Sequence, residues 1–247
     1  MTKAVYIHIP FCRSICSYCD FCKFIYNKQW VYVYLKALDK EIKDRYMDEN
    51  IKSIYIGGGT PSILKGKELI KLLDMTRIFH LTDNYEFTFE CNLEDIDEEL
   101  LLTLKKYGVN RLSIGIQSFQ ENNLKFMNRN ADFNDAKTKI KLCRKLGFNN
   151  INLDLMYAIP GENLRELKKD LNLFLELNPD HMSCYSLILE EHTKAFIDKY
   201  DYIDEEEDYK MFKHIEKKLS NAHHYEVSNY AILGHESIHN LTYWNNE

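Results

Sequence analysis

Short apolar runs alternate with longer amphipathic segments along most of the chain. The runs are rich in β-branched and aromatic residues and end at turn residues, which predicts strands: AVYIHI (4–9), SIYIG (53–57), EFTFEC (86–91), RLSIGIQ (111–117), NINLDLMYAI (150–159) and HMSCYSLIL (181–189). Apolar residues at helical spacing predict helices at about 29–48, 63–78, 95–107, 120–145 with a break near Asn130, and 163–177. The repetition predicts an α/β protein with a parallel sheet covered by helices, either doubly wound or a partial barrel.

The pattern changes after residue 200. A helix is expected at about 205–222, and it leads into HHYEVSNYAILGHESIHNLTYWNNE. This last stretch is rich in histidine and aromatic residues and shows no clear strand–helix repeat.

The composition is that of an ordinary globular protein, with 247 residues of which 45% are hydrophobic and 28% charged. A net charge of −6 argues against a protein that grips nucleic acid through its phosphates. No run approaches the roughly 20 apolar residues of a membrane span, and the start lacks the pattern of a signal peptide. We therefore expect a cytoplasmic protein whose contact with membranes, if any, is transient.

Residues with candidate chemistry follow the predicted strands. The carboxyl ends of parallel strands are where functional groups gather in such folds. Four cysteines follow the first strand, a Gly-Gly-Gly-Thr-Pro stretch (57–61) follows the second, Glu90 ends the third, Gln117 ends the fourth, and Asp154 lies in the fifth.

The first three cysteines, Cys12, Cys16 and Cys19, are spaced C-x3-C-x2-C. In a reducing compartment such a cluster more often binds metal than forms disulfides. Three thiolates would leave one iron of a four-iron cluster open to a small molecule, whereas a fully ligated cluster mainly carries electrons. The alternative is a zinc site, which usually shows two separated Cys/His pairs. No second pair stands out, although His8 is near.

The string YIHIPFCRSICSYC resembles the radical S-adenosylmethionine (SAM) superfamily. Further motifs resemble one group within it, the oxygen-independent coproporphyrinogen III oxidases and haem chaperones: IGGGTPS, FECN, RLSIGIQSF, NINLDLMYAIPGE, NPDHMSCYSL and HNLTYW. The resemblance implies a partial (β/α)6 barrel. It also implies that the three cysteines hold a [4Fe-4S] cluster, whose open iron binds SAM and whose electron cleaves it.

The resemblance implies a SAM site around the second to fifth strands. Gly58, Gly59 and Thr60 would meet the methionine part of SAM, where glycines let the backbone approach a ligand. Glu90 alternates with two phenylalanines, so it should face away from them, where a carboxylate suits an ammonium or a ribose hydroxyl. The other residues that the resemblance assigns to SAM are Gln117, Arg129 and Asp154. Tyr6 and Tyr18 are expected to flank the cluster and the adenine, although aromatic residues in strands often belong to the core.

The motif HNLTYW resembles the H-N-x-x-Y-W motif of the haem-chaperone branch, which implies that His239 binds haem. Neutral imidazole is a common axial ligand of haem iron, and Tyr243 and Trp244 could pack against a porphyrin. His223, His224 and His235 are alternative ligands. A packing or surface role is the plain alternative for His239.

The fourth cysteine, Cys22, is not expected to be a ligand. Oxidases of this group usually have a cysteine two positions after the third ligand, and here that position is Phe21. We expect Cys22 to be a small, partly buried side chain, with an accessory role near the cluster as the alternative. Cys91, Cys143 and Cys184 lie in or beside apolar runs and are expected in the core.

The sequence therefore predicts a radical SAM core domain in residues 1–200. Members of the group continue beyond the position of Trp244, so residues 201–247 are expected to begin a C-terminal domain that is truncated here. The first functional hypothesis is a haem chaperone that passes haem to an acceptor protein. The second is an oxygen-independent coproporphyrinogen III oxidase acting on a porphyrinogen. Either would use an electron donor such as reduced flavodoxin or ferredoxin. A radical enzyme acting on tRNA and a zinc module fit the charge and the motifs less well.

Overall fold

The computed structural model describes residues 3–245, and the chain forms two compact units. The first unit contains the chain up to Arg13, Cys22–Leu112 and the chain from Ser237 on, and the second contains Ser14–Phe21 and Ser113–Glu236. Segments from both ends of the sequence therefore fold into the first unit.

The first unit is built on three parallel strands in the order β1-β4-β5: β1 (Ala4–Ile9), β4 (Asn50–Gly58) and β5 (His80–Asn92). Its other strands, β2 (Phe11–Cys12) and β3 (Phe24–Ile25), form a small parallel pair. Its helices are α1 (Lys28–Arg45), α2 (Lys67–Met75), α3 (Glu98–Lys106) and α9 (Ile238–Trp244).

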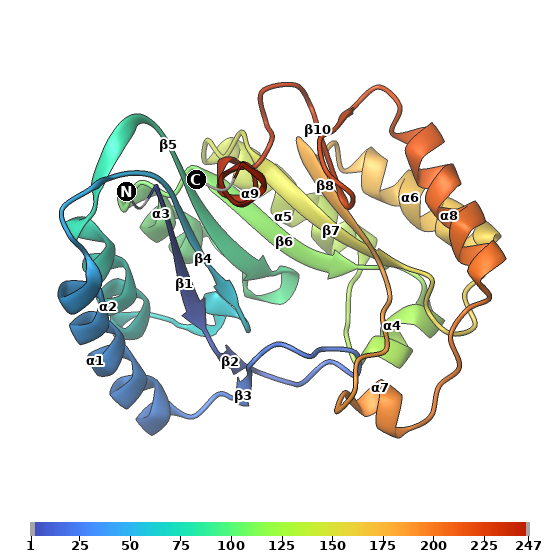
Figure 1. Ribbon diagram of the computed structural model, residues 1–247, viewed down its shortest axis with the longest axis horizontal. Helices are drawn as coiled ribbons and strands as arrows, with labels where there is room; N and C mark the ends of the chain where they lie inside the picture. The colour runs from blue at the N-terminus through green and yellow to red at the C-terminus, as the bar shows by residue number, and fades with distance from the viewer. Residues whose placement is uncertain (1–2, 246–247) are drawn as a thin grey trace. The chain divides into compact units, whose positions relative to one another are not determined.

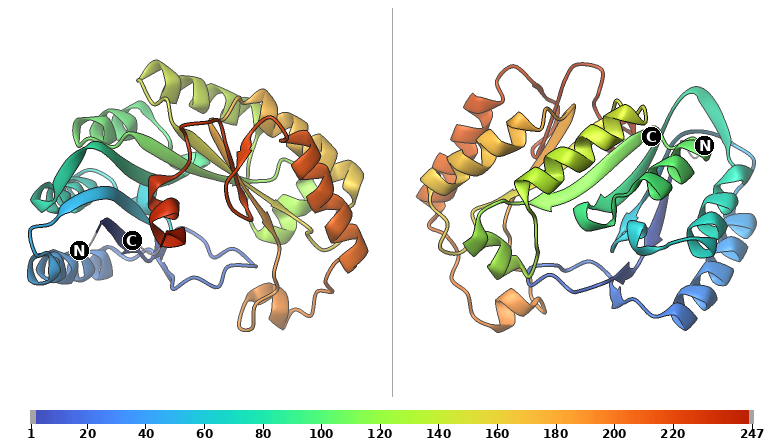
Figure 2. Two further views of the ribbon diagram at one scale, coloured as in Figure 1. Left: turned by 45° about the horizontal axis from the view of Figure 1, so that its top comes forward. Right: turned by 180° about the vertical axis from the view of Figure 1, so that it is seen from behind.

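The three strands have two distinct faces, and they position the candidate residues on one of them. Ile54 and Ile56 of β4 are fully buried, while Ser53 and Tyr55 alternate with them and contact His239 of α9. Successive strand residues point to opposite faces. In Figure 1, α1 and α2 lie on one side of these strands, and Figure 2 shows α9 on the other side.

The second unit continues the strand–helix repeat and ends in an antiparallel hairpin. Its strand order is β6-β7-β8-β10-β9, with β6 (Arg111–Gln117) entering from the first unit, β7 (Ile151–Tyr157) parallel to β8 (His181–Ser186), and β10 (Asn229–Ala231) antiparallel to both β8 and β9 (His223–His224). The helices are α4 (Glu121–Met127), α5 (Phe133–Lys145), α6 (Leu164–Glu176), α7 (Lys194–Ile197) and α8 (Glu205–Lys218).

The predicted order of elements is confirmed. All six predicted strands are present and each is followed by a helix, as the α/β reading requires. The predicted break near Asn130 is real, because α4 ends at Asn128 in the left-handed conformation (φ 55°) and α5 begins at Phe133. Asparagine tolerates this conformation better than most residues. The hairpin β9–β10 was not predicted.

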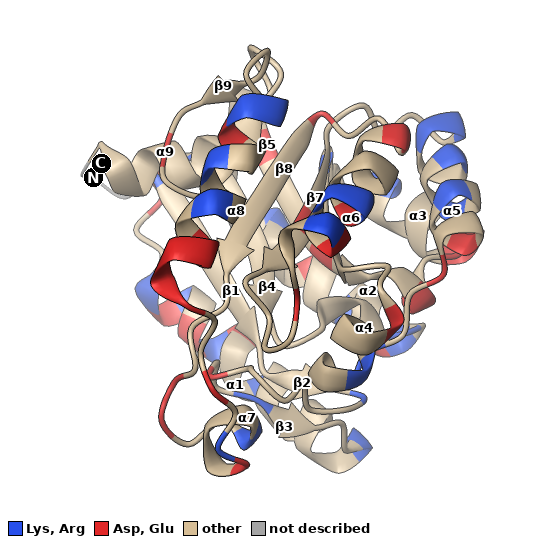
Figure 3. Ribbon diagram, turned by 90° about the vertical axis from the view of Figure 1, so that its right-hand side faces the viewer, with Lys and Arg blue, Asp and Glu red and all other residues tan. Residues whose placement is uncertain are grey.

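Helix ends in the second unit follow the local sequence. Asn163 and Glu166 form a capping box at the start of α6, in which each side chain binds the other residue's backbone amide. Helix α8 has four acidic residues in its first turn and two lysines in its last, as the colours in Figure 3 show. This distribution complements the helix dipole at both ends.

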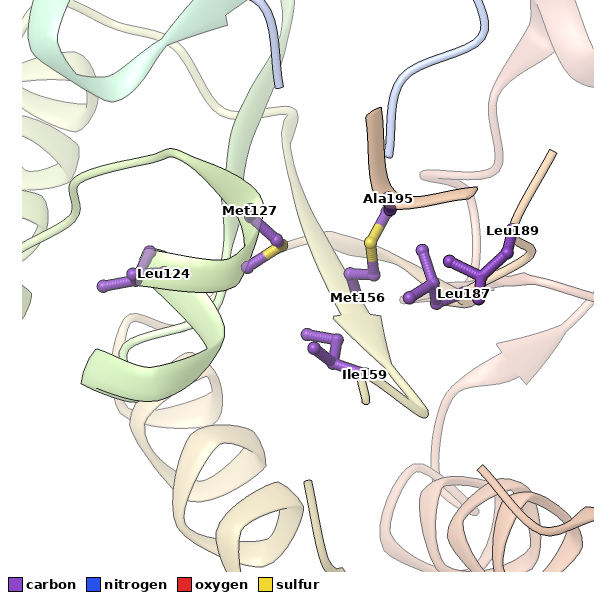
Figure 4. Packing of buried hydrophobic residues seen from close by; sticks show 7 residues of the cluster. All are labelled: Leu124, Met127, Met156, Ile159, Leu187, Leu189 and Ala195. Carbon is purple, nitrogen blue, oxygen red and sulfur yellow. The ribbon is translucent and has the colours of Figure 1, made fainter. Parts of the chain in front are cut away.

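A cluster of buried apolar side chains packs together in the second unit (Figure 4). It joins α4, β7, the segment after β8 and α7, and its members are Leu124, Met127, Met156, Ile159, Leu187, Leu189 and Ala195. Tyr18 packs against this cluster. No helix within residues 3–245 is long and apolar enough to cross a membrane.

Candidate functional site

The segment that carries the three spaced cysteines is closed at its base within the first unit. Cys12 ends β2 and stands opposite Ile25 of β3. The Phe24 amide donates to the Pro10 carbonyl at 2.7 Å, and the Tyr26 amide donates to the Cys12 carbonyl at 2.9 Å. The segment from Cys12 to Phe24 is therefore a closed loop whose first cysteine is held by a strand pair.

Cys16 and Cys19 lie on the part of this loop that belongs to the second unit. The Cys19 amide donates to the Cys16 carbonyl at 3.3 Å, which places the two residues on one turn. Between them, Ser17 anchors the turn because its hydroxyl donates to the Phe126 carbonyl at 2.6 Å. A guanidinium nitrogen of Arg129 lies 3.6 Å from the Cys16 sulfur.

The glycine stretch after β4 packs directly against the first cysteine strand. A Cβ atom on Gly59 would lie 2.8 Å from the Ile9 carbonyl oxygen, 2.9 Å from the Phe11 nitrogen and 3.0 Å from the Cys12 sulfur. Gly58 has a φ of 109°, a region that residues with a side chain rarely adopt. Thr60 is buried, and its amide donates to the Phe11 carbonyl at 2.9 Å. The glycines are therefore required by close approach as well as by backbone conformation.

Glu90 faces the same side of the first unit as Tyr55, away from the buried Phe87 and Phe89, as its alternation predicted. The Tyr55 hydroxyl donates to Glu90 Oε1 at 2.7 Å, and the Gly58 amide donates to Glu90 Oε2 at 3.0 Å. Two donors thus orient the carboxylate at the end of β5. An oriented carboxylate can bind an ammonium or a pair of hydroxyls without losing further rotamer freedom.

In the second unit, three predicted SAM residues lie at the end of β6, after the end of α4 and within β7. Gln117 ends β6 with a φ of 75° and is 8% exposed, an unusual conformation for a non-glycine residue and one that clusters at functional sites. Arg129 follows the C-terminal residue of α4, and its guanidinium donates to the Gly115 carbonyl at 2.6 Å. Asp154 Oδ1 accepts from the Asn152 amide group at 2.7 Å. This half-buried carboxylate therefore has a hydrogen-bond partner in its own strand.

Tyr18 lies beside several of these charged groups. Burial raises its pKa, and Arg129, Cys16, Cys19 and Asp154 all act on its charge. The structure therefore gathers these five predicted residues around one side of the second unit. In the first unit, Tyr6 lies on the face that carries Glu90 and is 44% exposed, so it is not a core aromatic.

His239 is buried on that same face of the first unit, with 4% of its surface exposed. Its Nδ1 lies 3.0 Å from the Ser53 hydroxyl, and within residues 3–245 its Nε2 is buried with no hydrogen-bond partner. Burial, with a contribution from Arg111, lowers the pKa of His239 to about 4. The imidazole is therefore neutral near pH 7. The surface role that the sequence left open for His239 is excluded.

Three aromatic rings surround this imidazole. The ring centroids of Tyr55, Tyr243 and Tyr6 lie 5.1, 5.2 and 6.2 Å from that of His239. Tyr243 is 65% exposed and Trp244 is exposed as well, so the aromatic part of the tail motif is open to a ligand while the imidazole is not.

One prediction about the cysteines is wrong. Cys22 was expected to be partly buried, but it is exposed. It lies two residues before the exposed strand β3, and its carbonyl oxygen is 2.8 Å from His8 Nε2. Cys91, Cys143 and Cys184 are buried, as predicted.

The sequence reasoning missed Glu86, Tyr55 and Ser53, which hold the tail motif and Glu90 in place. The signal for Glu86 was present but weak: it alternates with Phe87 in a predicted strand, and a charged residue buried in a strand needs a partner. Its partners lie about 150 positions later in the sequence, at Ser237, Ile238 and His239.

The cysteines suit an iron–sulfur cluster in their chemistry. None of the seven cysteines, all of which lie in the described part of the chain, forms a disulfide. Within residues 3–245, no three His, Cys, Asp or Glu side chains converge on one point to hold a single metal ion. A four-iron cluster does not require that, because each of its thiolates binds a different iron. The position of the Cys12 sulfur against Gly59 and of the Arg129 guanidinium near Cys16 fits a cluster held by thiolates.

Comparisons with known proteins agree with this arrangement. Residues 6–174 match the family described as the Radical SAM superfamily. The chain is 41% identical over 256 residues to the protein named Heme chaperone HemW of Bacillus subtilis, covering 99% of this chain and 68% of that protein. It is 36% identical over 249 residues to the Escherichia coli protein of the same name, covering 98% of this chain and 66% of that protein.

Among solved structures, one similar to this chain is coproporphyrinogen III oxidase (HemN) from Escherichia coli, which is described as a radical SAM enzyme. The two superpose with a TM-score of 0.87 at 25% sequence identity, and the match covers 95% of this chain and 56% of that one. The chain thus spans about two thirds of the length of the curated relatives named here and just over half of that structure. The cysteine spacing, the glycine stretch, the six strand–helix repeats and these matches agree, and the chain belongs to the radical SAM superfamily, within the group of haem chaperones and oxygen-independent coproporphyrinogen III oxidases.

Proposed function

We propose that the protein is a haem chaperone on a radical SAM scaffold, which binds a [4Fe-4S] cluster, SAM and haem and delivers haem to an acceptor protein. The observation that carries this proposal is the environment of His239. The proteins named above as haem chaperones, at 36–41% identity, support the same reading.

The two ring nitrogens of His239 have different surroundings, as is expected of a histidine that binds iron. Ligating histidines almost always bond through one nitrogen to the metal and through the other to a protein group that fixes the ring. Here Nδ1 is paired with the Ser53 hydroxyl, and Nε2 is the unpartnered atom. A buried polar atom without a partner costs free energy, so an incoming ligand that bonds to Nε2 would relieve that cost. The exposed Tyr243 and Trp244 offer aromatic surface for the porphyrin.

The cluster would be held by Cys12, Cys16 and Cys19. Such a cluster supplies, when bound, an electron to SAM at the iron that no cysteine binds. The chain's own residues contribute position and charge. Arg129 places a guanidinium beside Cys16, and Gly59 leaves the room that Cys12 needs.

The SAM site would use the residues that the family motifs supply. Glu90, oriented by Tyr55 and the Gly58 amide, would bind the ammonium or the ribose, and Gly58, Gly59 and Thr60 would line the methionine part. In the second unit, Gln117, Arg129 and Asp154 would bind the remaining polar groups, with Tyr18 beside the cluster. Tyr6 would flank the adenine from the first unit.

The alternative is an oxygen-independent coproporphyrinogen III oxidase, and the high structural similarity to one such enzyme favours it. Phe21, at the position where oxidases usually have a further cysteine, argues for the chaperone. A flavodoxin or ferredoxin-type donor, the cytoplasmic location and the division into a core at 1–200 and a C-terminal domain from 201 remain predictions.

A haem titration of the anaerobically reconstituted protein, followed through the Soret band, tests the proposal. We expect one haem per chain, and binding at least tenfold weaker in His239→Ala. His224→Ala serves as the matched control, because His224 is a candidate ligand in the second unit that stacks on Tyr230. His239→Met separates ligation from folding, because methionine also ligates haem iron and should shift the Soret band.

Each outcome decides between the candidates. Loss of binding in His224→Ala, with normal binding in His239→Ala, would move the ligand to the hairpin β9–β10. Absence of haem binding by the wild-type chain would reject the chaperone as proposed, and coproporphyrinogen III would then be the ligand to titrate.

A further inference from the structure

Tyr55 touches both the candidate haem ligand and the candidate SAM carboxylate. Its ring centroid lies 5.1 Å from that of His239, and its hydroxyl donates to Glu90 Oε1 at 2.7 Å. The other oxygen of Glu90 accepts from the Gly58 amide at 3.0 Å. One side chain of β4 thus connects α9 to the end of β5 and to the glycine stretch.

The side chains of Tyr55 and Glu90 are tightly packed against the backbone at Gly57. A Cβ atom on Gly57 would lie 2.7 Å from a ring carbon of Tyr55 and 2.7 Å from both Cδ and Oε1 of Glu90. Real side chains essentially never approach so closely, so the Tyr55 ring and the Glu90 carboxylate fill the space above Gly57. Close-packed interiors pass displacement on to their neighbours instead of absorbing it. A shift of the Tyr55 ring therefore moves the carboxylate or breaks its hydrogen bond.

Ligation of haem at His239 requires such a shift. The Nε2 atom is buried, and the whole imidazole is 4% exposed. The ring is enclosed by Tyr55, Tyr243 and Tyr6, and its other nitrogen is tied to Ser53. An iron atom can reach Nε2 only if the imidazole and the rings around it separate. The closed arrangement, in which Tyr55 packs on His239, is the one in which Glu90 is held by two donors.

We propose that Tyr55 couples the two sites, so that haem at His239 and SAM at Glu90 weaken each other's binding. This proposal rests on the proposed function, since it takes His239 as the haem ligand and Glu90 as a SAM residue. Tyr55 is a positioning residue in this scheme, because it acts on SAM through Glu90 and on haem through His239. The two states are the closed state, with Glu90 oriented and Nε2 buried, and an open state, with Nε2 accessible and Glu90 released.

Thermodynamic linkage makes the coupling reciprocal. If haem raises the dissociation constant of SAM by some factor, SAM raises that of haem by the same factor. Arrival of SAM would then promote release of haem. For a protein that must give haem up to an acceptor, this would couple cofactor binding to delivery.

The test measures the dissociation constant of SAM by equilibrium dialysis in the reconstituted protein, with and without saturating haem. We expect haem to raise this constant about fivefold, the lower end of the usual coupling range. In Tyr55→Phe, which keeps the ring but lacks the hydroxyl, the haem effect should fall below twofold. Tyr85→Phe is the matched control, because it also removes a tyrosine hydrogen bond in the first unit, to the Gly108 carbonyl at 3.1 Å. It should keep the full haem effect.

The outcomes separate this proposal from the proposed function. Haem binding that leaves the SAM constant unchanged, or lowers it, would overturn the coupling and leave the chaperone reading intact. A fivefold effect that survives in Tyr55→Phe would assign the coupling to another residue and overturn the role of Tyr55. No Soret change on adding haem would overturn both. The reciprocal titration, haem with and without SAM, must give the same factor if the two sites are linked.

Discussion

The carboxylate of Glu86 in the middle of β5 accepts a hydrogen bond from the backbone amide of His239 at 3.2 Å. The same carboxylate accepts from the Ile238 amide at 3.0 Å and from the Ser237 hydroxyl at 3.1 Å. A negative charge therefore sits at the N-terminal end of α9, where free amides and the helix dipole favour it. This contact fixes the tail motif on the first unit.

Replacement of Glu86 by glutamine should weaken the contact between β5 and the start of α9. The amide side chain brings two donors to a place where three donors already converge, and the buried Arg111, 3.9 Å from the carboxylate, loses this counter-charge. We expect the free energy of unfolding to fall by about 3 kcal/mol, the range for breaking a buried pair. Urea denaturation measures it, with Glu99→Gln on the exposed face of α3 as the control. Equal midpoints for the two variants would contradict the anchoring role.

The cysteine assignment predicts two classes of variant. Replacing Cys12, Cys16 or Cys19 by alanine should abolish the iron–sulfur absorbance after anaerobic reconstitution, because each thiolate binds a different iron. Cys22→Ala should reconstitute like the wild type. Iron and sulfide analysis checks both classes. A cluster lost in Cys22→Ala, or retained in Cys16→Ala, would overturn the ligand set, and the exposure of Cys22 makes the first of these outcomes easy to separate from misfolding.

Gly58→Ala should destabilise the protein more than Gly66→Ala does. Both glycines have positive φ angles, 109° and 51°, but a Cβ on Gly58 would collide with the His8 imidazole, whereas one on Gly66 would meet nothing within 4 Å. The backbone strain alone costs about 1 kcal/mol, and the collision adds roughly 1–3 kcal/mol. Paired urea denaturation curves measure the difference. SAM affinity should fall only in Gly58→Ala, because the collision with His8 displaces the backbone amide that donates to Glu90. Similar losses in both variants would show that the contact with His8 does not matter.

The repeating core of the fold was predictable because each of its strands and helices has a recognisable local sequence pattern. The strand at 111–117 was predicted with its observed bounds, and the break between α4 and α5 followed from the residues around Asn130. The hairpin β9–β10 was not, because β9 is two residues long and β10 three, too short to show alternation. Their pairing is with distant residues: β10 pairs with β8, and β9 pairs with β10.

The candidate site was predictable where a motif carries it and not where a contact does. The cysteine spacing and the glycine stretch are read directly from neighbouring residues. Glu86 and His239 are separated by 153 positions, and Tyr55 acquires its role only when β4, β5 and α9 come together. No local pattern contains that information. The prediction that Cys22 is partly buried was wrong for a similar reason, because the exposure of a loop depends on which other parts of the chain cover it.

Glu162 should make stability depend on pH in an unusual direction. Burial raises the pKa of its carboxyl to about 8, although Asn123 and the Ile159 amide both donate to it. The folded protein therefore holds this proton more tightly than the unfolded chain, whose glutamates titrate near 4.5. Since the native state then binds more protons between these two pH values, the contribution of Glu162 to the free energy of unfolding is fully present below about pH 4.5 and is lost as the pH rises to about 8.

Urea midpoints of wild type and Glu162→Gln, measured at pH 5.5 and 8.5, isolate this group. Glutamine cannot ionise, so the stability of the wild type relative to the variant should fall between the two pH values. A wild-type advantage that grows with pH would mean that Glu162 is ionised in the folded protein.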